Sequence, residues 1–331
     1  MEKNFTVVMY HYVRDLKHTR YPQIKGLDTE LFKEQVVYLQ KHYNLITVEE
    51  LIGAYCSGAD LPPRAALLTF DDGYADHFTN VLPVLRKKGI SGAFFPPVKA
   101  IKEHQILDVN KIHFILASAP DIHMLMKEVQ KCLKNYENEY LLLSFDDYFK
   151  KLAVSNRFDT KEVIFIKRLL QVELPETLRQ IITDDLFEKI VSVDQAAFSR
   201  ELYMSTEQLE HMLSCGMHIG SHGYDHYWLG SLSREDQRAE ITKSLSFLEE
   251  IGVDINNWTM CYPYGNYNQE TLSLLAEFKC RLGFTTKVDI ASLNGNYSHF
   301  EIPRLDTNDL PKSENASVDL WYEKAAGKNR I

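Results

Sequence analysis

Short, continuous apolar runs alternate with amphipathic helical patterns in residues 1–103, and again in residues 200–331, of this 331-residue chain. The runs that begin at Phe5 and Arg64, FTVVMYHYV and RAALLTF, are apolar at successive positions rather than at every second one. Such a strand is buried on both faces, which is typical of a parallel sheet covered by helices. The sequence therefore predicts an α/β fold. The number of strand–helix units favours a (β/α) barrel over an open sheet, but the sequence alone does not establish that the sheet closes into a barrel.

Residues 104–199 interrupt this alternation. Amphipathic helical patterns follow one another there, beginning with DIHMLMKEVQKCLKNY. We therefore expect a helical insertion at 104–199 between the two parts of a barrel, 1–103 and 200–331. The insertion either covers the substrate, forms an interface such as a homo-oligomer contact, or decorates the outside of the barrel.

The charge balance and the cysteines limit the partners and the compartment. The net charge of −9 and the pI of about 5.8 argue against nucleic acid as a partner. The five cysteines are scattered and lack CxxC spacing, which is typical of reduced intracellular proteins. The first residues lack a signal-peptide pattern, and no apolar run approaches the ~20 residues that span a bilayer. We therefore expect a cytoplasmic protein without a transmembrane segment, with peripheral membrane association as an alternative.

Polar residues gather where the predicted strands end, which is where the active sites of parallel α/β barrels lie. One such coincidence would be weak, but five separate strands contribute. The residues are His11, Asp71, Asp72, His222, His226, Pro263, Tyr264, Arg304 and Asp306.

Two spacings among these residues indicate a metal site. His222 and His226 have H-x-x-x-H spacing, which lets two imidazoles face one point if the segment turns helically, although alone it more often describes two surface histidines. Asp71 and Asp72 precede Gly73, and an Asp-Asp-Gly run alone is a polar turn. Together they offer two histidines and one carboxylate, a set that binds zinc or iron with open positions. The other carboxylate is then available as a general base.

A second Phe-Asp-Asp run lies in the insertion, in LLSFDDYFKKLA. Ser144 and Asp147 have the S-x-x-D spacing of a helix start, no glycine follows, and YFKKLAV continues a helical pattern. We therefore interpret Asp146 and Asp147 as acids at a helix start and the similarity of the two runs as chance.

Three motifs, in order along the chain, are similar to those of the polysaccharide deacetylases of carbohydrate esterase family 4. They are TFDDGYADHFTNVLPVLRKKGISGAFFP, GMHIGSHGYDH and CYPYGNYNQETLSLL, and the resemblance covers about residues 5–100 and 200–306. The first motif is long and very specific, and the third is the weakest. The N-terminal MYHYV resembles the start of the circularly permuted biofilm poly-N-acetylglucosamine deacetylases.

This resemblance implies a deformed (β/α) barrel that uses a divalent metal to remove the acetyl group of an N-acetylated sugar. Zinc is the expected metal, with cobalt, manganese, iron and nickel as alternatives. Asp71 matches the general base, and Tyr264 matches the residue whose backbone N–H contributes to the oxyanion hole. The positions that match the metal ligands are Asp72, His222 and His226.

The chain departs from the family pattern in two places. Cys261 stands where the third motif usually has an arginine that orients the base, and we expect Arg304, with Asp306 as its partner, to supply that charge. The family's late Leu-x-His motif is not evident, so His11 is the candidate general acid. Its alternative is a hydrogen-bonded histidine at the barrel mouth, and His299 is a less favoured substitute.

Several aromatic side chains near these motifs are candidates for stacking on a sugar, with ordinary packing as the alternative for each. They are Tyr74, Tyr224, Trp228 and Tyr267, and Tyr264 is also expected to contribute to substrate binding. Without a secretion signal, the expected substrate is an intracellular glycan precursor that is lipid-linked or nucleotide-linked. Two other functions stay open, namely hydrolysis of a non-sugar amide bond and carbohydrate binding without turnover.

Overall fold

The computed structural model describes residues 3–155 and 159–327, and the chain divides into two compact units. The first unit comprises Met1–Asp15, Gly26–Gln105 and Ser199–Ile331, and the second comprises Leu16–Lys25 and Ile106–Phe198. The first contains the predicted strands, and the second is helical.

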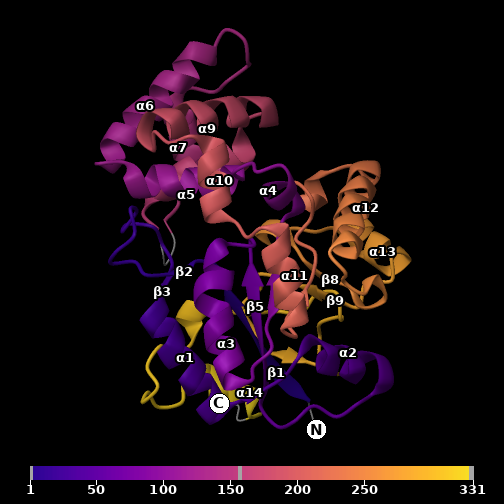
Figure 1. Cartoon of the computed structure of the whole chain (residues 1–331). Helices are drawn as coiled ribbons and strands as arrows, with labels where there is room; N and C mark the ends of the chain where they lie inside the picture. The colour runs from indigo at the N-terminus through magenta and orange to yellow at the C-terminus, as the bar shows by residue number, and fades with distance from the viewer. Residues whose placement is uncertain (1–2, 156–158, 328–331) are drawn as a thin grey trace. The chain divides into compact units, whose positions relative to one another are not determined.

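The strands of the first unit are short apart from two seven-residue strands at its centre (Figure 1). They are β1 (Asn4–Tyr10), β2 (Val13–Arg14), β3 (Leu27–Asp28), β4 (Asn44–Leu45), β5 (Ala65–Asp71), β6 (Ala93–Phe95), β7 (His218–Ile219), β8 (Thr259–Cys261), β9 (Leu282–Phe284), β10 (Ala291–Ser292) and β11 (Leu305–Asp306). Every residue of β5 is buried, as the continuous apolar run predicts.

Helices surround these strands (Figure 1). The α-helices are α1 (Thr29–His42), α2 (Val48–Ser57), α3 (Leu82–Lys88), α4 (Val98–Lys102), α11 (Thr206–Ser214), α12 (Arg234–Glu250), α13 (Gln269–Glu277) and α14 (Leu320–Ala325). The π-helical turn η1 (His77–Val81) leads into α3, and 3₁₀ turns occupy η3 (Leu229–Ser231), η4 (Ile255–Asn257), η5 (Pro263–Gly265) and η6 (Thr307–Asp309).

The main sheet is parallel except for the short strand β10, which pairs antiparallel with the start of β1. The ladder runs from β1 to β5, β6 and β7, each pair parallel, and β11 pairs with the other edge of β1. Parallel bridges continue the series from Ser221 to Met260 at β8, and from Phe284 at β9 to Ile302, just before β11. The predicted α/β fold with a parallel sheet is confirmed, and this order of pairing is consistent with a deformed barrel.

Hydrogen-bonding side chains and a glycine mark the ends of several helices. Thr47 and Glu50 form a reciprocal capping box at α2, and Ser205 and Gln208 form another at α11. Gly89 ends α3 in the left-handed conformation, as expected for a glycine after the last helical turn. Local side-chain chemistry therefore defines where these helices begin and end.

The second unit is a bundle of helices from residues 106–198. It contains α5 (Asp108–Ser118), α6 (Ile122–Tyr136), α7 (Phe145–Leu152), α8 (Lys161–Arg168), η2 (Leu169–Glu173) and α9 (Glu176–Ile190), and α10 (Gln195–Leu202) crosses the unit boundary. Leu125, Val129 and Leu133 of α6 are buried, as the helical pattern predicts. None of the helices in the described part of the chain is long and apolar enough to cross a membrane.

The helical unit also includes the segment Leu16–Lys25, which the sequence pattern had assigned to the barrel. Tyr21 packs edge-on against Phe114 and Phe198, and Lys25 pairs with Asp159. The segment therefore shares the core of the insertion, a contact across some ninety residues of sequence that no local pattern reveals.

Candidate metal and catalytic site

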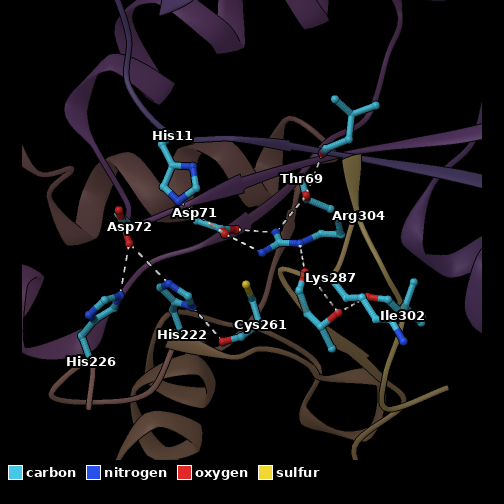
Figure 2. A network of polar contacts seen from close by, with 12 residues as sticks. His11, Thr69, Asp71, Asp72, His222, His226, Cys261, Lys287, Ile302 and Arg304 are labelled. Carbon is cyan, nitrogen blue, oxygen red and sulfur yellow. Dashed lines mark hydrogen bonds and ion pairs between the residues drawn. The ribbon is translucent and has the colours of Figure 1, made fainter. Parts of the chain in front are cut away.

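The carboxyl ends of the parallel strands bring together polar residues that are far apart in the sequence (Figure 2). Asp71 is the last residue of β5, and Asp72 follows it in the left-handed conformation with φ of 72°. His222 follows β7, His11 follows β1, and Arg304 immediately precedes β11. Gathering at the carboxyl ends of strands is therefore observed for the aspartates and both of these histidines, whereas Arg304 reaches the cluster from the start of β11.

Asp72, His222 and His226 form the candidate metal site. Oδ1 of Asp72 lies 3.3 Å from Nε2 of His222 and 3.4 Å from Nε2 of His226. The three side chains are buried, and one ligand atom from each lies within 4.8 Å of the others. Hydrogen bonds from both imidazoles outweigh burial and hold the pKa of Asp72 well below its usual range.

The orientation of His222 suits a metal ligand. Its Nδ1 lies 2.7 Å from the backbone carbonyl of Cys261 and must donate to it, because a carbonyl oxygen only accepts. A cation that replaces the proton on Nε2, the atom that faces Asp72, would therefore meet a lone pair on that nitrogen. Two imidazole nitrogens and one carboxylate oxygen fit zinc and related divalent cations.

His226 reaches the site by a different route from the helical turn that its spacing suggested. Residues 222–226 form no helix, and Gly223 and His226 both have positive φ. Glu240 of α12 stabilises this loop, because its Oε2 accepts hydrogen bonds from the backbone N–H groups of Tyr224 and Asp225 at 2.9 Å each. The loop therefore depends on a buried carboxylate that the sequence motif does not contain.

Asp71 lies next to the metal candidate but binds a different partner. Arg304 donates from both terminal nitrogens to the two oxygens of Asp71, at 2.8 and 2.7 Å, and both side chains are almost completely buried. Burial alone would raise the pKa of Asp71, but the Arg304 charge and hydrogen bonds outweigh it and lower the pKa to about 2. The expected replacement of the family arginine by Arg304 thus agrees with the geometry.

The expected partnership of Arg304 with Asp306 is wrong. The carboxylate of Asp306 caps η6 by accepting hydrogen bonds from the backbone and side chain of Asn308. Arg304 instead also donates to Oγ1 of Thr69 and to the carbonyl of Thr285. Residues 304 and 306 share a face of an extended segment, but Asp306 is the N-cap of η6, so its carboxylate turns to the backbone of that turn instead of to Arg304.

A second group with metal-ligand chemistry, formed by Asp71, His222 and Cys261, overlaps the first. Both oxygens of Asp71 already accept hydrogen bonds from Arg304, whose positive charge opposes a cation at this place. Burial raises the pKa of the Cys261 thiol, which disfavours the thiolate that would bind a metal. The Asp72 group is therefore the better cation site.

His11 lies at the edge of the same cluster. Its Nε2 is 3.9 Å from Oδ2 of Asp71, and its side chain is 41% exposed. Its backbone carbonyl accepts a hydrogen bond from Nε2 of His77, at 2.8 Å. Burial lowers the pKa of His77 to about 4, so this ring is neutral at pH 7. The substitute, His299, instead packs its ring against Tyr55 and Phe300.

Tyr264 lies in a strained turn beside the metal candidate. Its φ is 57°, and its ring packs edge-on against His226 and stacks on Trp228. Asp72 and His226 also have positive φ, so three of the seven such non-glycine residues in the described chain belong to this cluster. Concentrated backbone strain of this kind is typical of functional sites.

The structure corrects the expectation that Tyr74 binds a sugar. Tyr74 is fully buried, and its ring is nearly parallel to those of Tyr12 and Tyr203, with interplanar angles of 20° and 12° and centroids 4.0 and 6.2 Å away. Its hydroxyl donates to Oδ2 of Asp72 at 2.6 Å. The ring has no exposed surface, so it is not available for stacking on a sugar.

The other aromatic candidates have packing partners of their own. Tyr224 donates to Glu103 at 2.6 Å, and the ammonium of Lys243 lies over its ring. Tyr267 stacks on Tyr262 and donates to Glu301. Trp228 stacks on Tyr264, whose ring contacts His226. Among these aromatic candidates it is therefore the one that is linked to the candidate metal site.

Comparisons with known proteins agree with this geometry. A family model described as polysaccharide deacetylase matches residues 58–283. A poly-beta-1,6-N-acetyl-D-glucosamine N-deacetylase of Escherichia coli (strain K12) is 31% identical over 83 residues, which are 25% of this chain. The match spans only 12% of the length of that relative.

Two solved structures share the fold over nearly the whole chain. A Streptococcus pyogenes deacetylase, PplD in complex with acetate, has a TM-score of 0.55 at 15% identity, and the alignment covers 96% of both chains. IcaB from Ammonifex degensii has a TM-score of 0.55 at 18% identity, covering 98% of this chain and 96% of its own. The family match includes Asp71 and the three residues of the candidate metal site and extends over most of the chain, so this protein belongs to the polysaccharide deacetylase family.

Proposed function

We propose that this protein is a metal-dependent hydrolase that removes the acetyl group from an N-acetylated sugar or glycan precursor. One observation carries the proposal: adjacent aspartates have different partners, Asp72 with two histidines and Asp71 with Arg304. This is the division expected when one carboxylate holds a cation and its neighbour handles a proton. Membership of a deacetylase family supports the same reaction.

In this proposal the cation is held by Oδ1 of Asp72 and by Nε2 of His222 and of His226. Their mixed nitrogen and oxygen donors favour zinc, with cobalt, manganese, iron and nickel as alternatives. When bound, the cation would act as a Lewis acid that lowers the pKa of water to ~7, so that a weak base can remove a proton from that water.

Asp71 is the proposed general base. Its pKa of about 2 keeps it ionised at neutral pH, and its oxygens retain lone pairs beyond those that accept from Arg304. Arg304 fixes the plane of the carboxylate through its two parallel hydrogen bonds. The attacking water therefore meets an acceptor whose orientation is set before substrate binds.

Tyr264 and His11 have the remaining proposed roles. The backbone N–H of Tyr264 stabilises the oxyanion of the tetrahedral intermediate, a contribution typically worth ~10²–10³ in rate. His11 donates a proton to the departing amine, and its partly exposed ring near Asp71 suits exchange with solvent. Trp228 and Tyr264 offer the aromatic surface nearest the candidate ligand His226 for contact with a sugar.

The substrate class follows from the relatives. The matched E. coli protein is named for N-deacetylation of poly-beta-1,6-N-acetyl-D-glucosamine, so an N-acetylglucosamine-containing glycan is the first substrate to test. A lipid-linked or nucleotide-linked precursor inside the cell is the more specific form of this proposal. We also propose that the helical unit contributes to substrate selection or to an interface between copies of the chain.

Metal analysis combined with acetate release tests the function directly. The panel holds poly-β-1,6-N-acetylglucosamine, chitooligosaccharides, nucleotide-linked N-acetyl sugars and free N-acetylglucosamine. We expect one divalent ion per chain and metal-dependent acetate release from at least one sugar. Stoichiometric metal without release from any of them would redirect the proposal to a non-sugar amide or to binding without turnover.

A shortened chain tests the role of the insertion. A variant in which a short linker replaces residues 106–198 is assayed for substrate preference and for oligomeric state by light scattering. A changed preference or a changed mass supports a functional role, whereas a folded variant with both properties unaltered identifies the helices as decoration.

A further inference from the structure

The two oxygens of Asp72 have different partners. Oδ1 faces the Nε2 atoms of His222 and His226 at 3.3 and 3.4 Å, whereas Oδ2 accepts a hydrogen bond of 2.6 Å from the hydroxyl of Tyr74 (the histidine contacts appear in Figure 2). The phenol must be the donor, because an ionised carboxylate only accepts. A hydrogen bond on Oδ2 leaves Oδ1 as the oxygen that is offered to a cation.

The position of this phenol is set by the surrounding structure. The Tyr74 ring stacks on Tyr12 with centroids 4.0 Å apart and lies parallel to Tyr203, and a backbone bridge joins residues 74 and 203. Met204 donates its backbone N–H to the carbonyl of Gly73. Tyr74 is fully buried, so its hydroxyl cannot leave Asp72 without disturbing this column of rings.

Gly73 fixes the geometry between Asp72 and Tyr74. Its φ is 65°, and a Cβ at this position would lie 2.7 Å from Cβ of Pro96. Only glycine fits in this turn. The turn places the Tyr74 hydroxyl against the carboxylate of Asp72, two residues earlier. Asp72 itself has φ of 72°, so the conformation of the carboxylate depends on support from its neighbours.

We infer that Tyr74 is a positioning residue for metal binding: its hydroxyl orients Asp72 so that one carboxylate oxygen meets the cation. This inference rests on the proposed metal-dependent function. Groups that hydrogen-bond to metal ligands typically change metal affinity by ~10–100-fold when they are removed. Tyr74 therefore acts on the cation through Asp72 and not on the substrate.

The test is the Zn²⁺ affinity of the full-length Tyr74→Phe variant, measured by competition with a chelating dye. Phenylalanine keeps the stacked ring and removes only the hydroxyl. We expect the Zn²⁺ dissociation constant to rise about 10–100-fold, with a fall in the melting temperature in EDTA similar to that of the control variant below. An affinity within threefold of the wild type would overturn the inference while leaving the proposed function intact.

Tyr262→Phe is the matched control. Tyr262 is also fully buried, and its hydroxyl also donates one hydrogen bond, but to the carbonyl of Phe300 rather than to a metal ligand. Its loss should lower stability without changing Zn²⁺ affinity by more than threefold. Equal losses of affinity in both variants would mean that general destabilisation, and not the position of Asp72, explains the result.

Two further outcomes are informative. If the wild-type chain binds no divalent ion, both the inference and the proposed function fail. If Tyr74→Phe does not fold, Tyr203→Leu removes one face of the ring column and keeps the Tyr74 hydroxyl. That variant should weaken Zn²⁺ binding by a smaller factor, about 3–10-fold, and an unchanged affinity would overturn the inference.

Discussion

The two Phe-Asp-Asp runs of this chain have almost the same sequence and opposite surroundings. Asp71 and Asp72 end a fully buried strand and are 2% and 4% exposed. Asp146 and Asp147 are exposed in the first turn of α7, where Oγ of Ser144 accepts from the backbone N–H of Asp147. The predicted helix start is confirmed, and the comparison teaches that partners, rather than the residue pair, determine the chemistry of the carboxylates.

The difference begins with the residue that follows each pair. Gly73 adopts a positive φ and reverses the chain against Pro96, so the aspartates stay at the strand end. In the second run the residue that follows the pair is Tyr148, which is buried and helical, and Lys150 and Lys151 come after it. Acidic residues at a helix start are stabilised by the helix dipole and need no buried partner.

Removing one carboxylate from each run should give the largest contrast. Asp71→Asn removes the proposed general base, so we expect acetate release to fall about 10²–10⁴-fold, while Asp146→Asn stays within twofold of the wild type. The measurement is the initial rate with saturating metal, after circular dichroism has confirmed folding. Equal activities of the two variants would remove Asp71 from the mechanism.

Breaking the partnership of Asp71 should have the next largest effect, on stability. Arg304→Met leaves Asp71 as a buried charge without its guanidinium, which we expect to cost about 3–5 kcal/mol in urea unfolding. Lys150 lies 3.8 Å from Asp147 at an exposed site, so Lys150→Met should change stability little. A loss below 1 kcal/mol for Arg304→Met would show that the buried pair is not needed for the fold.

Zn²⁺ binding should depend on the second aspartate of the first run and not on that of the second run. Zn²⁺ at 100 times its dissociation constant should stabilise the wild type by about 2.7 kcal/mol, because it binds the folded chain. Asp72→Asn should lose most of this stabilisation, and Asp147→Asn should keep it. The measurement is the unfolding free energy with and without Zn²⁺, and full retention in Asp72→Asn would contradict the ligand assignment.

Acid should act on the first run through Asp71. Arg304 lowers the pKa of Asp71 to about 2 in the folded state, below the value of 3.8 usual for an aspartate. The folded chain therefore holds this proton less tightly than the unfolded chain, and the resulting stability is complete above about pH 4 and lost as pH falls toward 2.

The size of this effect is about 2 kcal/mol. It should appear as a shrinking stability difference between the wild type and Asp71→Asn when urea unfolding is measured from pH 5 downward. A difference that is independent of pH across this range would mean that the Arg304 pair does not shift the titration of Asp71.

These contrasts also show how much the sequence could predict. Local signals are sufficient for the buried strand β5 and the helix start at Ser144, because each depends on neighbours within a few residues. Strand ends then brought Asp72 near His222, since parallel strands align their carboxyl ends.

Contacts across long separations could not be predicted in the same way. The family resemblance leads to Arg304 as the group that orients Asp71, 233 positions away, but no local signal shows that Asp306 caps η6 instead of pairing with Arg304. The sequence leaves both sugar stacking and ordinary packing open for Tyr74, and tertiary contacts with Tyr12 and Tyr203 decide for packing. Aromatic residues beside a motif carry no local sign of which face they present.

The smallest effect should come from the helix start of the second run. Ser144→Ala removes the oxygen that accepts from the backbone N–H of Asp147, and loss of such a cap typically costs about 1 kcal/mol. Urea unfolding should detect this loss, whereas acetate release and Zn²⁺ affinity should match those of the wild type. Because Asp146 and Asp147 keep their charges in this variant, a fall in activity would mean that α7 contributes to the reaction. The two runs would then differ in their surroundings but share a function, and the interpretation of their similarity as chance would be wrong.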